Sequence, residues 1–260
     1  MPVMSTEEVE PRFADLDAWP LASAIEAMWE GQMTAVAAVR PALPAITAAV
    51  EAAARALDRS GRLIYVGAGT SGRVAVQDGA ELPPTFDWAS ERTLFLMAGG
   101  QEAFIASIEG ADDAARAVRQ LEALSPTPAD VVIGVAASGT TPYTVAAVKR
   151  ARAMGAVTIG IANNPDTPLL TEAGFPVLIH TGSELIAGST RMKAGTAQKV
   201  VLNLISTGIM LRLGKVYRGM MVSMRVANAK LERRAERMVA SLAGCDLPAA
   251  AEALREAGND

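Results

Sequence analysis

One stretch decides the predicted fold of this chain: residues 61–86, GRLIYVGAGTSGRVAVQDGAELPPTF. Residues 63–66 are apolar and β-forming, so they predict a buried strand. The glycine-rich turn 67–72 follows, and residues 73–80 predict a helix that starts from this turn. Small residues let the backbone turn tightly, and a helix start offers free N–H groups at the positive end of its dipole. The stretch therefore predicts a cradle for an anion, phosphate in particular.

The turn alone does not identify its ligand. GAGTSG matches neither the dinucleotide-binding fingerprint, whose last glycine would be out of register, nor the P-loop, whose Gly-Lys-Ser/Thr is missing. A glycine-rich turn after a strand is often only a turn. The helix must stop before Pro83 and Pro84, which leaves Glu81 at its end. We expect Glu81 to lie beside whatever the cradle holds.

Composition narrows the function classes. The chain has 260 residues and a net charge of −4, and its Lys and Arg residues are scattered, which argues against nucleic-acid binding. We expect no membrane span, since no apolar run approaches about 20 residues, and no secretory signal in the acidic N-terminus. Cys245 is the only cysteine, which predicts a reducing, cytoplasmic location. One His and one Cys argue against a zinc site or a Cys/His nucleophile, so we expect no metal.

A second unit repeats the design of the first. Residues 131–135 predict a strand, and AASGTTP (136–142) follows, with Ser138, Gly139, Thr140 and Thr141 in the turn and Pro142 at a helix start. Further strands are predicted at 93–97, 157–161 and 177–179, with helices between them. This alternation predicts a parallel sheet covered on both faces, whose ligand binds at the carboxyl ends of the strands. Two similar turns at such ends favour phosphate.

Helices are predicted on both sides of this region. An irregular arm (1–19) precedes helices at 21–39 and 45–57, and further helices are predicted at 101–108, 112–124, 189–213, 220–242 and 247–257. Polar residues crowd the start of the 189–213 helix, among them Glu184, Ser189 and Lys193. A solvated helix end explains some of them but less readily explains such a cluster directly before an apolar run, so Glu184, Ser189 and Lys193 are candidates for substrate binding beside a structural role.

The motifs together resemble a known family. GAGTSGR (67–73), AASGTTPY (136–143) and SELIAGSTRMKAGTAQK (183–199) resemble the sugar isomerase (SIS) domain family. With DGAELPPTF (78–86), SIEGADD (107–113) and LGKVYRGMMV (213–222), the resemblance narrows to the N-acetylmuramic acid 6-phosphate etherases and covers nearly the whole chain.

This resemblance implies a five-stranded parallel, flavodoxin-like α/β sheet and a homodimer. It implies a cofactor-free lyase that splits the D-lactyl ether of N-acetylmuramic acid 6-phosphate, by elimination and then addition of water, during cell-wall recycling. It places the acid/base carboxylates at Glu81 and Glu109, and the phosphate-holding hydroxyls at Thr70, Ser71, Ser138 and Thr141. The implied division is an arm and helix (1–44), a SIS domain (45–215) and a helical region (216–260), in which we expect the family's last helix to be missing. Ala136 stands where many SIS phosphate loops carry Ser.

Two other readings stay open at this point. A sugar-phosphate sensor like the regulator of glucokinase would use the same domain without turnover. An aldose–ketose isomerase would move protons between C1 and C2 and needs no lactate pocket. The sequence does not settle which glutamate acts at C2; we assign the lactate and water protons to Glu81. We interpret His180 and Cys245 as structural.

Overall fold

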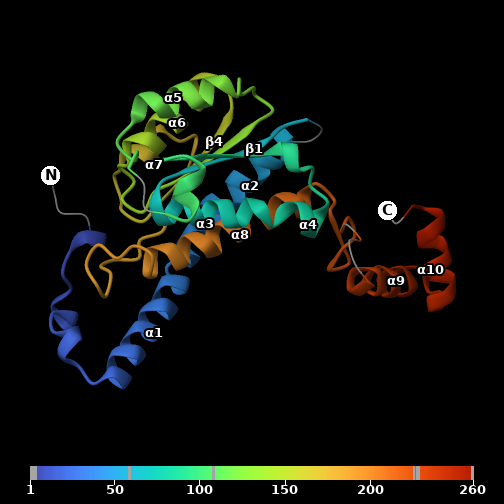
Figure 1. Ribbon diagram of the computed structural model, residues 1–260, viewed down its shortest axis with the longest axis horizontal. Helices are drawn as coiled ribbons and strands as arrows, with labels where there is room; N and C mark the ends of the chain where they lie inside the picture. The colour runs from blue at the N-terminus through green and yellow to red at the C-terminus, as the bar shows by residue number, and fades with distance from the viewer. Residues whose placement is uncertain (1–4, 58–59, 107–108, 225, 227–228, 259–260) are drawn as a thin grey trace.

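A five-stranded parallel sheet forms the centre of the molecule, with strand order β2-β1-β3-β4-β5. The computed structural model describes residues 5–57, 60–106, 109–224, 226 and 229–258 (Figure 1). The strands are β1 (Leu63–Gly67), β2 (Thr93–Met97), β3 (Val131–Val135), β4 (Val157–Ala162) and β5 (Phe175–Leu178). This is the flavodoxin-like order, so the predicted fold class is confirmed.

Helices cover both faces of the sheet. The helices on one face are α2 (Leu43–Leu57), α3 (Gly69–Ala80) and α8 (Lys193–Arg212), and those on the other are α5 (Ala114–Ala123), α6 (Pro142–Ala153) and α7 (Pro168–Glu172). Side chains alternate along a strand. Leu63 and Tyr65 of β1 therefore enter the core on the face covered by α2, α3 and α8, while Ile64 and Val66 enter the core on the face covered by α5, α6 and α7. Burial on both faces explains why β1 is apolar throughout.

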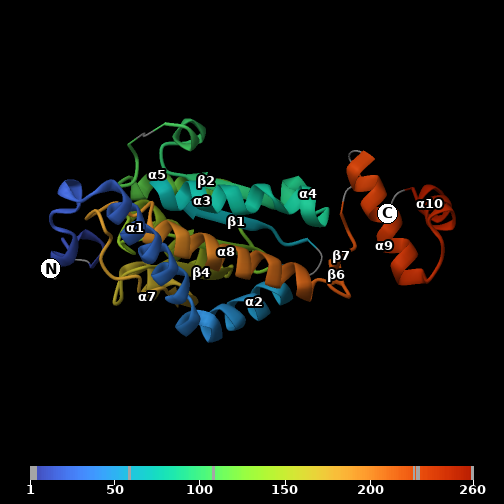
Figure 2. The ribbon, with the colours of Figure 1, turned by 90° about the horizontal axis from the view of Figure 1, so that it is seen from below.

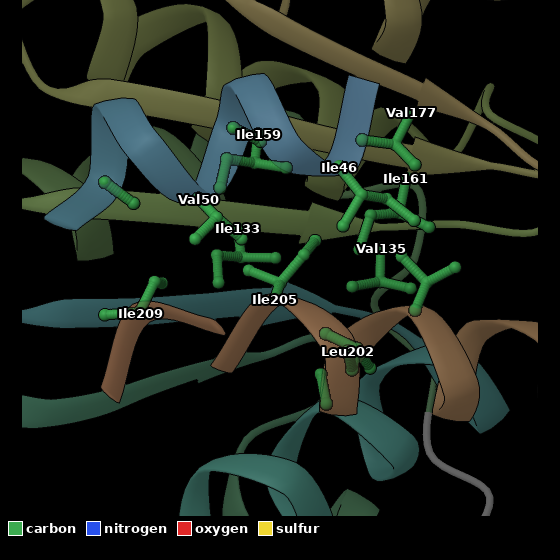
Figure 3. Close-up of a cluster of buried hydrophobic side chains, with 14 of the residues drawn as sticks. Ile46, Val50, Ile133, Val135, Ile159, Ile161, Val177, Leu202, Ile205 and Ile209 are labelled. Atoms are coloured by element: carbon green, nitrogen blue, oxygen red, sulfur yellow. The ribbon is translucent and has the colours of Figure 1, made fainter. Parts of the chain in front are cut away.

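The core between α2 and α8 fixes the position of α8. Figure 3 shows Ile46 and Val50 of α2 beside Ile205 of α8, next to side chains of the central strands. Ile205 and Ile209 are fully buried. Each such side chain contributes about 1.5–3 kcal/mol by leaving water. This packing holds α8 along the sheet and so determines where its first turn lies.

The two ends of the chain extend from opposite ends of the sheet domain (Figures 1 and 2). Three short 3-10 turns within residues 5–18 lead to α1 (Leu21–Ala37), and a turn at residues 40–42 joins α1 to α2. At the other end, α9 (Ala229–Ala243) and α10 (Leu247–Glu256) pack against each other. A small hairpin of β6 (Val216–Tyr217) and β7 (Met220–Met221) leads to them.

Several element boundaries differ from the prediction. The helix predicted at 220–242 begins only at Ala229, because Met220 and Met221 pair with the preceding strand; residues 225 and 227–228 lie outside the described residues. Residues 101–104 form a 3-10 turn rather than a helix, and 107–108 also lie outside the description. A short helix, α4 (Leu82–Phe86), accepts both prolines in its first turn, where their missing N–H groups are not needed.

One stretch, Leu21–Leu57, is long and apolar enough to cross a membrane by length and composition, with a mean hydropathy of 1.5. We expected no such stretch. Its second half is α2, whose Ala49, Ala53 and Leu57 are fully buried against the sheet. Core packing therefore explains the apolar character of α2, whereas α1 keeps an exposed apolar face.

Candidate active site

Two loops leave neighbouring strands at the same level of the sheet. Gly67 at the end of β1 is in register with Val135 at the end of β3. The strand order reverses here, since β2 lies beyond β1 and β4 beyond β3. Ligands of open parallel sheets bind in the crevice at such a reversal. The structure therefore brings the two predicted turns together, as expected.

The first loop is shorter than predicted, because α3 already begins at Gly69. Thr70 and Ser71 lie in its first turn, and no side chain caps this helix start among the described residues. Gly72 packs against the backbone of Gly67, where an added Cβ would lie 2.9 Å from the Gly67 carbonyl carbon. This close approach brings the helix start, with its free N–H groups, directly to the strand end.

The second loop is a hydroxyl-bearing turn. The Oγ of Ser138 accepts a hydrogen bond from the Thr140 N–H at 3.2 Å and lies 3.4 Å from the Oγ1 of Thr141. Gly139 has a φ of +70°, which favours glycine. An added Cβ at Gly139 would also overlap with the buried side chain of Thr167. Ser138, Thr140 and Thr141 remain half-buried, with their side chains at the crevice.

The start of α8 forms a third wall and is occupied by a side chain of the protein itself. The carboxylate of Glu184 accepts hydrogen bonds from the backbone N–H groups of Lys193 (2.8 Å) and Ala194 (2.9 Å). Glu184 is 1% exposed, and burial raises its pKa although these bonds oppose the rise. Burial lowers the pKa of Lys193, whose Nζ donates to the Ser183 carbonyl oxygen. Both side chains therefore hold the helix start in place.

The first turn of α8 reaches the first loop. A Cβ placed on Gly195 would lie 3.4 Å from the Cγ2 of Thr70. Residues 189–192, predicted to be helical, instead form turns in which Ser189 accepts from the Met192 N–H. Because the Glu184 carboxylate occupies the helix N-terminus, α8 starts at Lys193. Ser189 is half-buried four residues before that start.

The two predicted carboxylates lie at different ends of the site region. Helix α3 has 12 residues, and at a rise of about 1.5 Å per residue its ends lie about 18 Å apart. Glu81 therefore does not lie beside the first loop of its own chain, contrary to our expectation, because the helix that starts at the loop carries Glu81 away from it. Both Glu81 and Glu109 are exposed to solvent.

Glu109 lies on the crevice side of the sheet. The chain leaves β2 beside the first loop, where the Ala98 N–H donates to the Gly67 carbonyl oxygen at 3.0 Å. Gly110 returns to this point, since an added Cβ there would lie 2.8 Å from the Gly99 nitrogen. The Tyr143 N–H then donates to the Ala111 carbonyl oxygen and ties this segment to α6. Glu109 therefore directly precedes a segment that joins the end of β2 to the start of α6.

Sequence reasoning missed a buried polar cluster behind the site. Asp78 on α3 is 2% exposed and accepts hydrogen bonds from the side chains of Tyr65 (2.9 Å), Asn203 (2.7 Å) and Ser206 (3.1 Å). Burial raises the pKa of Asp78, and these bonds oppose the rise. The cluster joins the C-terminal part of α3 to the middle of α8 and so fixes the two helices relative to each other. Asp78 opens the motif DGAELPPTF (78–86), but no local pattern in the sequence indicated its partners.

It also missed the residues after β4. Asn163 accepts from the side chain of Gln198 at 2.9 Å, and Asn164 donates to the Ala137 carbonyl oxygen at 3.0 Å. Both asparagines are buried. The sequence marked them only as the end of a strand. The two asparagines reach the second loop because β4 lies next to β3, and this strand order cannot be predicted from the local sequence.

No group of three or more His, Cys, Asp or Glu side chains gathers as a metal site within the described residues. The candidate site consists of hydroxyls, backbone N–H groups and carboxylates. These groups suit the binding of a phosphate ester and the transfer of protons.

Comparisons with known proteins identify the relatives of this chain. Family models match the glucokinase regulatory protein N-terminal SIS domain over residues 45–152 and the SIS domain over residues 113–207. A protein of Deinococcus radiodurans named N-acetylmuramic acid 6-phosphate etherase is 52% identical over 254 residues, which cover 97% of this chain and 83% of that protein. The protein of the same name from Streptomyces coelicolor is 47% identical, over 93% of this chain and 78% of its own length.

Solved structures share the fold. A phosphoheptose isomerase from Francisella tularensis superposes with a TM-score of 0.53 at 17% identity, over 76% of this chain and 100% of that one. A phosphoheptose isomerase from Neisseria gonorrhoeae gives a TM-score of 0.51 at 16% identity, over 74% of this chain and 99% of that one.

Proposed function

The chain belongs to the N-acetylmuramic acid 6-phosphate etherase family, and from this premise we propose how its residues carry out the reaction. The activity is that of a carbon–oxygen lyase in amino-sugar recycling. It splits the D-lactyl ether of the phosphosugar with water, giving N-acetylglucosamine 6-phosphate and D-lactate. The observation that carries the proposed site is the meeting of two hydroxyl-bearing loops, in register, at the reversal of the sheet.

The 6-phosphate binds between these two loops. Thr70 and Ser71 supply hydroxyls and the free N–H groups at the start of α3, whose dipole favours an anion. Ser138 and Thr141 face them from the second loop, while Gly139 and Thr140 supply backbone. Ser189 approaches from the third wall. Glu184 and Lys193 shape that wall. They take part in substrate binding indirectly, by holding the backbone at the start of α8 in place.

Proton transfers between two carboxylates account for the reaction. In the open-chain sugar, the C2 proton lies next to an aldehyde and the ether oxygen is on C3. Glu109 removes the C2 proton, and Glu81 protonates the departing lactate oxygen, which leaves an unsaturated aldehyde. Glu81 then takes a proton from water as its oxygen adds to C3, and Glu109 returns a proton to C2. Each positioned acid or base contributes about 10²–10⁴-fold to such a rate.

A second copy of the chain supplies the missing carboxylate. The phosphorus of this sugar lies well within about 10 Å of its C2 and C3, whereas α3 separates Glu81 from the first loop by about 18 Å. Glu81 therefore serves the site of a partner in a homodimer, and the partner's Glu81 serves this one. Two-fold symmetry makes such an exchange reciprocal.

An exposed apolar face on α1 supports the homodimer. Its large side chains recur along one side of the helix, and Trp29 among them is 63% exposed. They are Leu21, Ile25, Trp29, Met33 and Val36. The opposite side of α1 is buried through Ala24, Ala27 and Ala35. A contiguous apolar stripe of this kind marks an interaction surface, and a two-fold axis lets the same stripe pair with itself.

A charged residue in this stripe tests the dimer. Trp29→Glu should give a monomer by sedimentation, with loss of activity, because a carboxylate would have to enter the interface. Leu247→Glu places the same charge on an exposed leucine of α10 and should leave the dimer intact. If Trp29→Glu remains dimeric and active, α1 is not part of the dimer interface.

Product analysis tests the function itself. We expect the protein to release D-lactate and N-acetylglucosamine 6-phosphate from N-acetylmuramic acid 6-phosphate, and to act poorly on the unphosphorylated sugar. The match to the glucokinase regulatory protein domain leaves a phosphosugar sensor as the second candidate. Binding of the substrate with no D-lactate formed would favour the sensor. A ketose phosphate as the product would instead indicate an isomerase. The proposed compartment is the cytoplasm, which suits a phosphorylated substrate and a lone thiol.

A further inference from the structure

The N-terminal segment lies at the carboxyl ends of the strands, where it contacts residues that are distant in sequence. Thr6 is fully buried although it belongs to the segment of short turns that precedes α1. A buried polar residue needs hydrogen-bond partners. Those of Thr6 come from two separate parts of the site region, one after β4 and one before α8.

The first set of contacts runs through Asn164. Its Nδ2 donates both to the Oγ1 of Thr6 at 3.1 Å and to the Ala137 carbonyl oxygen at 3.0 Å. Its Oδ1 accepts from the Oγ of Ser5 at 2.9 Å. One side-chain amide thus joins the N-terminal segment to the residue directly before Ser138. Asn164 is 3% exposed, so these partners replace water.

The second contact runs through the backbone. The Thr6 carbonyl oxygen accepts from the Gly188 N–H at 3.0 Å, directly before Ser189. Gly188 has a φ of +73°, and a Cβ added there would lie 3.0 Å from a carboxylate oxygen of Glu7. The N-terminal segment therefore contacts the third wall of the site directly and is linked to the second loop through Asn164.

We propose that Thr6 and Asn164 are positioning residues, which set the spacing between Ser138 on the second loop and Ser189 on the third wall. Neither residue touches the substrate in this arrangement. The inference rests on the proposed site, since it assigns these residues to the binding of the phosphosugar. It extends that site to a segment 158 positions away from the asparagine that it holds.

Matched substitutions test this role. Thr6→Val keeps the side-chain shape but removes the acceptor for Asn164, so the second loop loses part of its support. A displacement of about 1 Å can cost about 10²-fold, and for this smaller change we expect KM for the phosphosugar to rise about tenfold. The expected kcat stays within about threefold, because the carboxylates do not move. Thr6→Ser keeps the hydroxyl and should restore the wild-type KM.

The control is a threonine with a local partner. Thr47→Val removes a hydroxyl that donates to the Leu43 carbonyl oxygen in its own helix, and KM should not change. A Thr6→Val protein with the KM of Thr6→Ser would overturn the proposal, as would an equal fall in kcat at constant KM. If Thr6→Val does not fold, Ser5→Ala removes the outer bond to Asn164, and an unchanged KM would again overturn it.

A binding measurement separates this proposal from the proposed function. Calorimetry with inorganic phosphate needs no turnover and reports on the loops alone. Weaker phosphate binding by Thr6→Val than by Thr47→Val supports the positioning role even if the wild-type protein forms no D-lactate. Equal phosphate affinity in an active wild-type protein and Thr6→Val would reject the role while leaving the etherase reaction intact.

Discussion

The two edges of the sheet are built in opposite ways. At the amino edge, where the strands begin, charged side chains find partners within the chain. The guanidinium of Arg62 binds both carboxylate oxygens of Asp130, and Arg92 donates to the carbonyl oxygens of Gly61 and Leu57. At the carboxyl edge, the first turn of α3 has no side-chain cap among the described residues. The amino edge therefore pairs its charged side chains within the chain, whereas the start of α3 at the carboxyl edge leaves N–H groups for a ligand.

This difference separates stability from function. A paired and buried charge such as Asp130 is costly to disturb but has no capacity left for another partner. An uncapped helix start beside half-buried hydroxyls costs stability and offers that capacity. Substitutions at the amino edge should therefore change folding, and those at the carboxyl edge should change catalysis. Glu81 is the exception to this division, because α3 carries it away from the carboxyl edge.

The largest expected effect comes from the two carboxylates. Glu81→Gln and Glu109→Gln should each keep substrate binding and lower kcat by about 10²–10⁴-fold, because an amide has no proton to transfer. A heterodimer that combines one chain of each variant then distinguishes the two arrangements. If Glu81 acts in the partner's site, one of the two sites has both carboxylates and about half of the wild-type activity returns.

Differently tagged, co-expressed chains provide this heterodimer, and D-lactate release measures it. Homodimers of each variant, purified in the same way, are the controls. A heterodimer as inactive as both homodimers would place Glu81 and Glu109 in the same chain's site. If the kcat of either variant stays within about threefold of the wild-type kcat, the substituted glutamate is not a catalytic residue.

The sheet and its loops were predictable because their signals are local. An apolar run that is buried on both faces, as in β1, is readable from composition. The glycine turn and its hydroxyls follow directly. The hairpin at Arg218 and Gly219 was not predicted: both residues have positive φ in the structure, but of the two only the glycine is a usual turn residue. We predicted a helix there, because the apolar spacing beyond it resembled one.

The rest of the site depends on contacts between distant residues. Helix α8 begins at Lys193 rather than at 189 because the buried Glu184 carboxylate binds its first N–H groups. The support of the second loop by Thr6 joins residues 158 positions apart. The distance of Glu81 from the first loop was calculable from helix length alone. The calculation shows that Glu81, although it lies in the same sequence motif as the first loop, need not lie in the same binding site.

The next effect concerns the amino edge. Asp130→Asn should lower the free energy of unfolding by about 3 kcal/mol, because it removes a buried carboxylate and leaves the half-buried Arg62 without its charged partner. Steady-state kinetics of the folded variant should match the wild type. Urea unfolding measures the change, with Glu172→Gln as the control, since that residue pairs with Lys149 at the surface and exposed pairs contribute about 0–1 kcal/mol.

The carboxyl edge should give the reverse result. Ser138→Ala removes one of the proposed phosphate ligands, and a hydrogen bond to a charged group contributes about 1.5–3 kcal/mol. We expect KM to rise at least about tenfold while unfolding by urea stays as in the wild type. Inorganic phosphate should inhibit the wild type more strongly than this variant. A stability loss without a change in KM would place Ser138 with the structural turns and weaken the contrast between the edges.

The smallest effect is a change of stability with pH, in opposite directions for two buried aspartates. Burial alone would raise the pKa of Asp130, but hydrogen bonds from Arg62 and Thr127 outweigh it and hold that pKa below its ordinary value. Burial raises the pKa of Asp78, where the donors are neutral and Lys199 adds an attractive charge. One carboxyl therefore favours its charged form in the fold, and the other favours its protonated form.

The signs follow from proton linkage. The contribution of Asp130 is complete above the unfolded pKa of about 3.9 and is lost as the pH falls through its lower folded pKa. That of Asp78 is complete below about 3.9 and is lost as the pH rises through its higher folded pKa. In urea unfolding between about pH 3 and pH 7, the stability gap between wild type and Asp130→Asn should widen with rising pH, and the gap to Asp78→Asn should narrow. Two gaps that both widen with rising pH would show that neutral donors stabilise a buried carboxylate as effectively as Arg62 does, and two that both narrow would contradict the role of Arg62.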